Sequence, residues 1–177
     1  MQKNVILIIA GAGTHFFGPN SRKTIKNKEL LLNNLEVLAQ RPMNKAVVNL
    51  TTSTDTTKGI TVFDNVRKEA LVKVTLFSDN LIDAQNELLL NTHEGDEKRL
   101  NADQFDFVFP PEDFEIHICG IDLNGSLKNT IQTLLEKEYK VTVFSDALRP
   151  FTSSAQYINT LKPNPLFQYC SYKAVRS

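Results

Sequence analysis

The chain has 177 residues, of which 41% are apolar and 8% aromatic, and its 20 basic side chains balance its 20 acidic ones. This length suits a single domain whose core is large enough to need no disulfide or metal. The apolar content and the zero net charge exclude a disordered chain and a general polyanion-binding protein, so we expect no nucleic-acid partner.

The cysteines and the amino terminus indicate a cellular compartment. The apolar run at residues 4–10 is too short to span a bilayer, and it ends in glycines without the features of a secretory signal. Cys119 and Cys170 both lie in apolar, strand-like surroundings, which favours inert buried thiols over a disulfide. We therefore expect a cytoplasmic protein with no membrane part.

The first third of the chain predicts two strands joined by a long helix. Residues 4–10 form a near-continuous apolar run, as expected for a central parallel strand that is covered on both faces. Apolar residues recur at helical spacing over residues 22–40, and Ser21 or Asn20 can cap the start of that helix. A second strand follows at residues 46–50.

The middle of the chain has a weaker pattern. Short strands are expected at residues 60–63 and 71–77, and the spacing of apolar side chains predicts a helix over residues 80–91. Residues 92–113 are polar and acidic around the apolar island Phe105–Phe109. We interpret them as an acidic excursion with room for one small strand.

The stretch from Glu115 to Leu148 has the most regular pattern. A buried strand over residues 116–119 stops at Gly120, and Ser126 then opens a helix with one apolar face. A second apolar strand begins at Val141. One helix between two strands is a βαβ unit, which implies parallel strands and a right-handed crossover.

The carboxyl-terminal residues complete the alternation of strands and helices. Ser153 or Ser154 caps a short helix, and residues 166–175 predict a last strand. Together the elements predict one α/β domain over residues 1–177, a three-layer α/β/α sandwich around a mostly parallel sheet of about six strands.

Charge is unevenly distributed along the chain. Residues 1–50 carry seven lysines and arginines against two glutamates, whereas residues 79–115 carry eleven acidic residues against Lys98 and Arg99. One interpretation is solvated faces together with an acidic loop. The other is that the basic and acidic surfaces meet in a homo-oligomer or in a complex with a protein partner.

The βαβ segment resembles a known family. A strand ends in Cys119-Gly120, a helix opens at Ser126 after five intervening residues, and a Tyr-x-Val-x-Val strand beginning at Tyr139 ends in an acidic residue and alanine. This arrangement resembles the nucleophile segment of the isochorismatase-like hydrolases, which have a Rossmann-like fold. In that family a cysteine stands where Ser126 falls.

The resemblance extends to the first strand. The family follows this strand with Asp-x-Gln-x-x-Phe, and alignment on Phe16 places Gly11 at the aspartate, which is the general base, and Gly13 at the glutamine. The lysine of the family's triad corresponds to Lys73, although the spacing is one residue off. The resemblance therefore implies a hydrolase fold that lacks both the base and the nucleophile of the family.

The residues themselves leave several interpretations of this site open. Gly11-Ala12-Gly13 suggests a dinucleotide-binding turn, but Phe16 stands where the third glycine is needed. His15 has the side chain of a general base, or it is a non-catalytic turn residue. Ser126 is either a nucleophile near a helix N-terminus or an ordinary helix cap.

No metal site is expected. Metal-binding members of the family use Asp-x-His after the second strand, and here only Asp55 could ligate there. His93 and His117 are dispersed, and His117 alternates with apolar residues, which predicts a packed and hydrogen-bonded side chain. We also expect no cofactor.

These observations favour a catalytically degenerate isochorismatase-like protein that acts as a binding or assembly subunit, with a site for a small carboxylate or amide. The alternative is an active hydrolase of C–N or vinyl-ether bonds, in which Ser126 acts with His15 or Lys73. The residues expected to contact a ligand are Gly11, Gly13, Asp122, Asn124 and Gly125.

Overall fold

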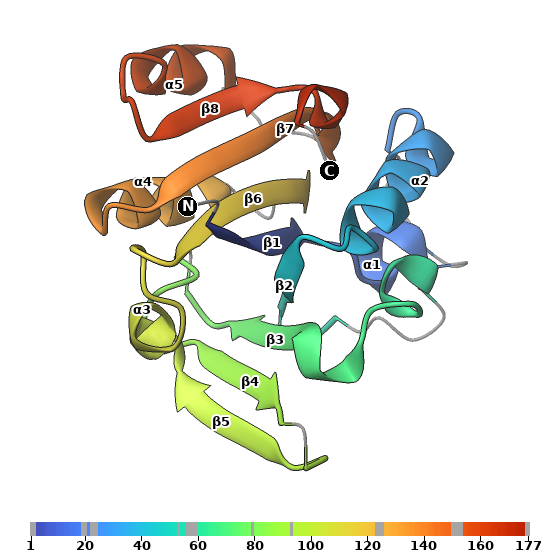
Figure 1. Cartoon of the computed structure of the whole chain (residues 1–177). Helices are drawn as coiled ribbons and strands as arrows, with labels where there is room; N and C mark the ends of the chain where they lie inside the picture. Colours follow the sequence, from blue (N-terminus) through green and yellow to red (C-terminus); the bar gives the residue numbers. More distant parts are fainter. Residues whose placement is uncertain are drawn as a thin grey trace.

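Eight strands form one twisted sheet between two layers of helices, as the ribbon of the computed structural model shows (Figure 1). The structure describes residues 3–18, 21, 25–52, 54–55, 60–78, 80–92, 94–122, 126–149 and 154–175, although not the side chains of Thr14, Ser126, Ser154 and Ala155. The strands are β1 (Asn4–Ala10), β2 (Asn44–Thr52), β3 (Leu71–Leu76), β4 (Glu87–Asn91), β5 (Glu97–Asn101), β6 (Phe114–Ile121), β7 (Lys140–Arg149) and β8 (Phe167–Cys170). The α-helices are α1 (Thr14–Phe17), α2 (Lys28–Ala39), α3 (Phe105–Val108), α4 (Ser126–Glu136) and α5 (Ser154–Leu161), and 3-10 turns occur at η1 (Thr61–Phe63), η2 (Lys68–Ala70), η3 (Ala102–Gln104) and η4 (Tyr172–Ala174).

The strand order is β5-β4-β3-β2-β1-β6-β7-β8. The six neighbouring strands β3, β2, β1, β6, β7 and β8 pair in parallel. Beyond β3, the strands β4 and β5 extend the sheet as an antiparallel hairpin. The mostly parallel α/β sheet is confirmed. It has eight strands rather than six because the residues predicted as a helix and an excursion supply β4 and β5.

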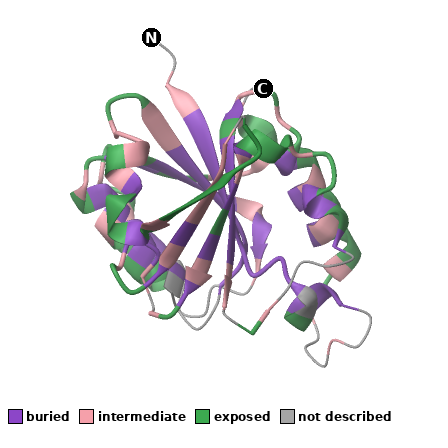
Figure 2. Ribbon diagram, turned by 90° about the horizontal axis from the view of Figure 1, so that it is seen from below, coloured by how far each residue is buried: buried purple, intermediate pink, exposed green. Residues whose placement is uncertain are grey.

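Each face of the sheet packs against its own layer. Side chains of β1 alternate between the faces, so Ile6 and Ile8 join the core under α4 and α5, while Leu7 and Ile9 join the core under α2. Figure 2 shows the buried middle of the sheet between the two layers. This burial on both faces explains the continuous apolar run of β1.

The βαβ unit β6-α4-β7 is confirmed. Its strands pair in parallel, and the pairing shifts register after Ile118, so that Gly120 pairs with Leu148. Gly120 has a φ of 107°, and a Cβ there would lie 2.1 Å from the carbonyl oxygen of Ala10. Only glycine allows β6 to approach β1 this closely. The predicted helix near the carboxyl terminus is present as α5. The strand predicted over residues 166–175 is observed only as β8, because the 3-10 turn η4 follows it.

The predicted helix over residues 80–91 is wrong. Leu81 and Ile82 are buried beside α4, but they lie in a turn, and β4 follows. The buried amide of Asn86 holds this turn by accepting the backbone N–H of Phe77 at 2.7 Å and of Ser78 at 3.0 Å. The apolar side chains therefore anchor a turn rather than one face of a helix.

The predicted strand at residues 60–63 is also wrong. Val62 and Phe63 are buried in the core under α2, within the single 3-10 turn η1. They cannot join the sheet beside β2, because β1 and β3 already pair with its two edges.

The helix predicted over residues 22–40 is observed as α2, but its start differs. Its N-cap is Asn27 in a left-handed conformation without a side-chain cap, so Ser21 does not cap it. Ser21 instead donates its hydroxyl to the carbonyl oxygen of His15 at 2.6 Å. Asn20 lies outside the described residues. No described helix is both long and apolar enough to cross a membrane.

Candidate functional site

The winding direction of the sheet reverses between β1 and β6. The chain builds β2 and β3 on one side of β1 and then returns to place β6 on the other side. Open α/β sheets bind ligands beyond the carboxyl ends of the strands at such a switch. Gly11 directly follows β1 and Asp122 directly follows β6, so the fold places both at this position.

The turn after β1 is anchored by aromatic side chains. Gly11 has a φ of 62°, and its N–H donates to the carbonyl oxygen of Leu50 at 3.1 Å. The one-turn helix α1 follows, in which Phe16 and Phe17 donate their N–H groups to the carbonyl of Gly13. Both phenylalanine side chains are buried in the core on the α2 side. At the position where the resemblance implies a general base, the chain offers no side chain.

Asp55, in the loop after β2, fills the space beside Gly13. A Cβ on Gly13 would lie 2.0 Å from Asp55 Oδ2, so the glycine is needed for the carboxylate to fit. Asp55 Oδ1 accepts the backbone N–H of His15 at 3.2 Å, and Oδ2 lies 3.8 Å from His15 Nδ1. The Asp55 side chain is 1% exposed and the His15 side chain 45% exposed. A buried carboxylate thus holds an accessible imidazole beyond the carboxyl ends of β1 and β2. We call this end of the sheet the carboxyl edge.

This arrangement disfavours nucleotide binding at the glycine turn. A phosphate beside Gly13 would meet the negative charge of Asp55, which is buried there and therefore little screened by solvent. The sequence pattern indicates Asp55 only as a metal ligand. Its place three residues beyond the end of β2, a central parallel strand, is the signal that puts it near the site.

Asp122 holds the start of α4 against the end of β6. Its Oδ1 accepts the backbone N–H of Leu127 at 3.3 Å, and its own N–H donates to the carbonyl oxygen of Arg149 at 3.0 Å. A carboxylate at a helix N-terminus satisfies a free N–H and suits the helix dipole. Asn124, Gly125 and the side chain of Ser126 lie outside the described part of the structure, so their predicted roles stay predictions.

Lys73 does not face the start of α4. Val74, its neighbour on β3, is fully buried in the core that α4 covers, whereas Lys73 is exposed. Adjacent residues of a strand point to opposite faces, so Lys73 faces the side of the sheet that carries α2. The structure therefore brings His15 and Asp55 together but places Lys73 on the opposite face from α4.

Two further reactive side chains lie on β6, and both are structural. Cys119 is fully buried, its thiol lies 3.7 Å from the carbonyl oxygen of Ile8, and burial raises its pKa well above the ordinary value. His117 is buried with Nε2 3.1 Å from Glu115 Oε1, which confirms the packed, hydrogen-bonded histidine expected from the sequence. The hydrogen bond from His117 and the nearby Lys140 ammonium lower the pKa of Glu115. His93 lies outside the described residues, and among those described no three His, Cys, Asp or Glu side chains are grouped to hold a metal ion.

No protein-family model and no curated protein sequence matches the chain. Solved structures do match it over nearly its whole length. An isochorismatase-like hydrolase from Alkaliphilus metalliredigens is 11% identical with a TM-score of 0.59, and the match covers 97% of this chain and 96% of that one. N-carbamoylsarcosine amidase from Thermoplasma acidophilum is 9% identical with a TM-score of 0.65, covering 98% and 99%. The MAR1 ribonuclease of Caenorhabditis elegans is 14% identical with a TM-score of 0.64, covering 97% and 79%.

These likenesses show that the chain has the isochorismatase-like hydrolase fold. At 9–14% identity they show the fold alone. The names of these three proteins include an amidase and a ribonuclease, so this fold carries more than one chemistry, and the function has to be argued from the residues of the site.

Proposed function

We propose that this protein keeps the isochorismatase-like fold without its hydrolytic chemistry and acts as a binding or assembly subunit. The observation that carries the proposal is the position of Lys73 on the face opposite α4, with Val74 in its place under that helix. Gly11 supplies no base, and α4 opens with Ser126 in place of the cysteine that the resemblance implies. All three elements of the expected triad are thus displaced or replaced, which supports lost catalysis more simply than a variant mechanism.

A small neutral amide suits the carboxyl edge better than a carboxylate does. The carboxylates of Asp55 and Asp122 both lie there, and Lys73, the cation expected to neutralise an anionic ligand, lies on the face of the sheet opposite α4. Carboxylate oxygens accept hydrogen bonds from an amide NH₂, whereas they repel a second carboxylate. We therefore favour an amide among the two ligands that the sequence suggested.

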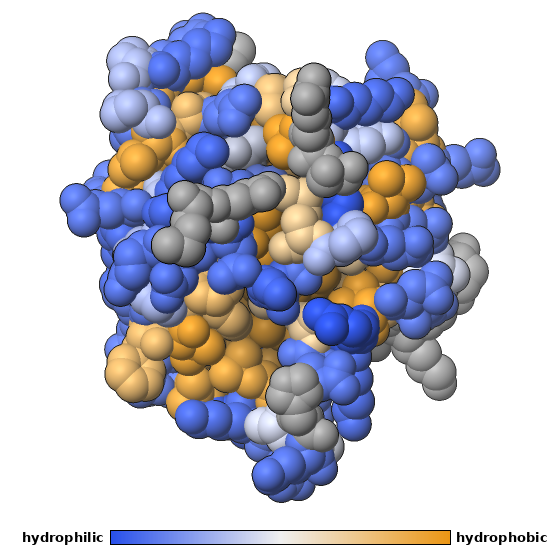
Figure 3. Space-filling model, viewed as in Figure 1, coloured by the Kyte–Doolittle hydropathy of each residue, from blue (hydrophilic) through white to orange (hydrophobic). Residues whose placement is uncertain are grey.

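The assembly role rests on charge and on an exposed apolar patch. Figure 3 shows apolar surface over α3 and the adjoining strands, where Phe107 is 86% exposed and Leu90 and Leu100 are half-buried. Exposed apolar patches of this kind are typical of interaction sites. The residues of this patch belong to the acidic segment 79–115. The basic segment 1–50 of a second copy complements the charge of that segment. Homo-oligomerisation is the form of assembly we propose.

The test of lost catalysis is a comparison of wild type with Ser126→Ala on N-carbamoylsarcosine, the amide in the name of one of the similar structures. We expect the two proteins to give the same background rate at every substrate concentration. A wild-type rate more than tenfold above that of Ser126→Ala would contradict the proposal. Sedimentation velocity tests assembly separately: we expect a mass above that of the monomer, which falls on Phe107→Ser and on addition of 1 M salt.

A second candidate function is an active hydrolase in which Ser126 is the nucleophile and His15 its base. The Asp55–His15 pair favours it, because a buried carboxylate beside Nδ1 orients a histidine as a general base in serine hydrolases. In that case Asp55→Asn and His15→Gln would each lower the turnover number, and Lys68→Gln, an exposed change at the amino end of β3, would leave it unchanged.

A further inference from the structure

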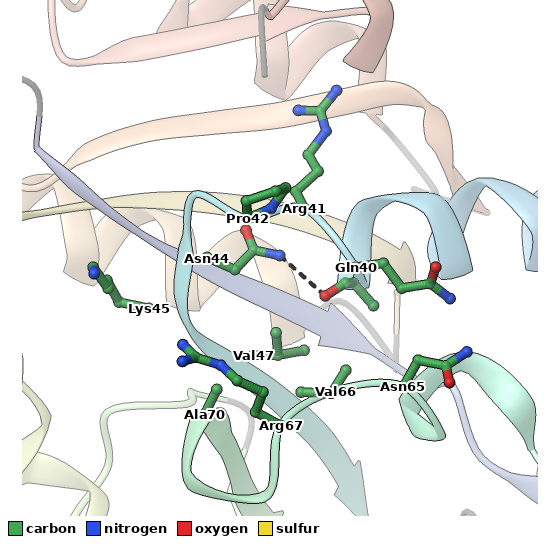
Figure 4. Close-up of a pocket in the computed structure, with 11 residues that line it drawn as sticks. Gln40, Arg41, Pro42, Asn44, Lys45, Val47, Asn65, Val66, Arg67 and Ala70 are labelled. Carbon is green, nitrogen blue, oxygen red and sulfur yellow. Dashed lines mark hydrogen bonds between the residues drawn. The ribbon is translucent and has the colours of Figure 1, made fainter.

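A separate cavity lies at the amino edge of the sheet, opposite the carboxyl edge. It has a volume of about 430 Å³ and lies between the segment that joins α2 to β2 and the turn that precedes β3 (Figure 4). β2 has nine residues, which at about 3.3 Å per residue separates its two ends by roughly 25 Å. The cavity is therefore distinct from the site at Gly11.

Two cations border this cavity. Lys45 projects from the start of β2 and Arg67 from the residue before η2, and both side chains are exposed. In Figure 4 their charged ends lie on the same side of the cavity, while the guanidinium of Arg41 points away from it. None of the residues lining the cavity is acidic, and within the described part of the chain neither Lys45 nor Arg67 has an ion-pair partner. Two unpaired cations on one side of a cavity attract an anion.

The remaining wall combines a rigid amide with an apolar floor. Asn44 is buried, and its Nδ2 donates to the carbonyl oxygen of Leu38 at 2.8 Å and of Ala39 at 3.3 Å, which fixes the segment at the end of α2. Buried Ala39, Val47 and Ala70 contribute apolar surface. Gln40 and Asn65 lie on the side opposite the two cations and add amide groups (Figure 4).

This combination fits one class of ligand. The volume of the cavity falls in the range of small-molecule sites, about 300–1,000 Å³, and its lining is more polar than that of most such sites, which suits a charged ligand. The planar guanidinium of Arg67 suits the two oxygens of a carboxylate or phosphate, and Lys45 adds a second positive charge. The apolar floor suits a compact hydrocarbon or aromatic body.

We propose that this cavity binds a small organic anion, with its oxyanion group at Lys45 and Arg67 and its apolar body on Val47 and Ala70. The site is independent of the carboxyl edge, so it stands whether or not that edge retains catalysis.

The experiment is an NMR titration of ¹⁵N-labelled protein at low ionic strength with benzoate, benzamide and inorganic phosphate. Benzoate has both the anion and the apolar body, benzamide has only the body, and phosphate has only the anion. We expect benzoate to give saturable shifts confined to the backbone amides of Gln40, Asn44 and Asn65 and their neighbours, with an affinity at least tenfold above that of benzamide and of phosphate.

Variants assign the binding to the two cations. Lys45→Gln/Arg67→Gln should weaken benzoate binding at least tenfold. The matched control is Lys68→Gln, because Lys68 is an exposed cation next to Arg67 that does not line the cavity, and this variant should bind as wild type does. All three positions are exposed, so folding is not at risk, and far-UV circular dichroism verifies it. The proposal is overturned if benzoate gives no saturable shifts at these residues, if benzamide binds equally well, or if Lys68→Gln weakens binding as much as the double variant.

Discussion

Two phenylalanines in the acidic excursion of residues 92–113 allow its contribution to the hydrophobic core to be measured. Its helix α3 carries two phenylalanines in opposite environments: Phe105 is fully buried, and Phe107 is 86% exposed. The ring of Phe105 lies 5.2 Å from that of Phe109 and 6.1 Å from that of Tyr139. Removing a buried phenylalanine typically costs about 3–5 kcal/mol, and the lost ring pairs place Phe105→Ala in the upper part of this range. Phe107→Ala is the matched control, with an expected change within about 0.5 kcal/mol.

Urea unfolding followed by far-UV circular dichroism measures this difference, since the chain has no tryptophan for fluorescence. With an m-value of about 2 kcal/mol/M, a loss of 4 kcal/mol lowers the midpoint by about 2 M. The protein concentration is kept low enough that the chain is monomeric. If Phe105→Ala fails to fold, Phe105→Leu provides a smaller loss that remains measurable. A loss below about 1 kcal/mol for Phe105→Ala, or one equal to that of Phe107→Ala, would refute the inference that the excursion belongs to the core.

Three further substitutions test backbone fit and buried polar groups. Gly120→Ala should lower the free energy of unfolding by about 2–4 kcal/mol in thermal melts, because the φ of 107° and the 2.1 Å distance to a backbone oxygen both oppose a Cβ. The control is Gly95→Ala, which should lose only about 1 kcal/mol, since Gly95 has a φ of 87° but no atom within 4 Å of an added Cβ. Glu115→Gln should cost about 1–2 kcal/mol at pH 7. The hydrogen bond from His117 lowers the pKa of Glu115 in the fold, so the contribution of Glu115 is present above about pH 4.5, and the difference from wild type should shrink as the pH falls below that value. Tyr139→Phe should lower the free energy of unfolding by about 1 kcal/mol at pH 8, because the hydrogen bond to a backbone carbonyl is lost. Burial raises the pKa of Tyr139, so denaturant titrations of the wild type should show a further loss of stability above about pH 10, and the variant should lack that loss.

The sequence predicts those elements whose pattern is local. The unit β6-α4-β7 follows from a change of hydrophobic period at Gly120 and Ser126, and the burial of β1 follows from its continuous apolar run. The turn at residues 80–86 does not follow from such a pattern. Its apolar residues have helical spacing, and the turn depends on Asn86 finding backbone N–H groups and on Leu81 donating its N–H to Thr130 Oγ1 at 3.0 Å on α4. These two residues are 49 positions apart, so their contact leaves no signal in a hydrophobic pattern that is read over about eleven neighbouring residues.

In the candidate site, too, some features follow from the sequence pattern and others depend on contacts between distant residues. The strand-end rule places Gly11 and Asp122 correctly at the switch between β1 and β6, because it depends only on strand order. The face to which Lys73 points changes if the alignment with the family's lysine shifts by one residue, and the motif spacing is itself one residue off. The contact between His15 and Asp55 joins two loops, and it requires the absence of a side chain at Gly13, so neither residue indicates it alone.

The two ends of the central strands differ in charge, and this difference decides where an anion can bind. The carboxylates of Asp55 and Asp122 lie at the carboxyl edge. Lys45 and Arg67, which have no ion-pair partner among the described residues, border the cavity at the amino edge. A small anion therefore meets like charge where the winding of the sheet would ordinarily place a ligand, and opposite charge at the other end. Neutralising Asp55 as Asp55→Asn should accordingly leave benzoate binding unchanged at low salt, while Lys45→Gln/Arg67→Gln weakens it. Equal effects of the two changes would mean that the anion binds by the general field of the protein rather than in the cavity at the amino edge.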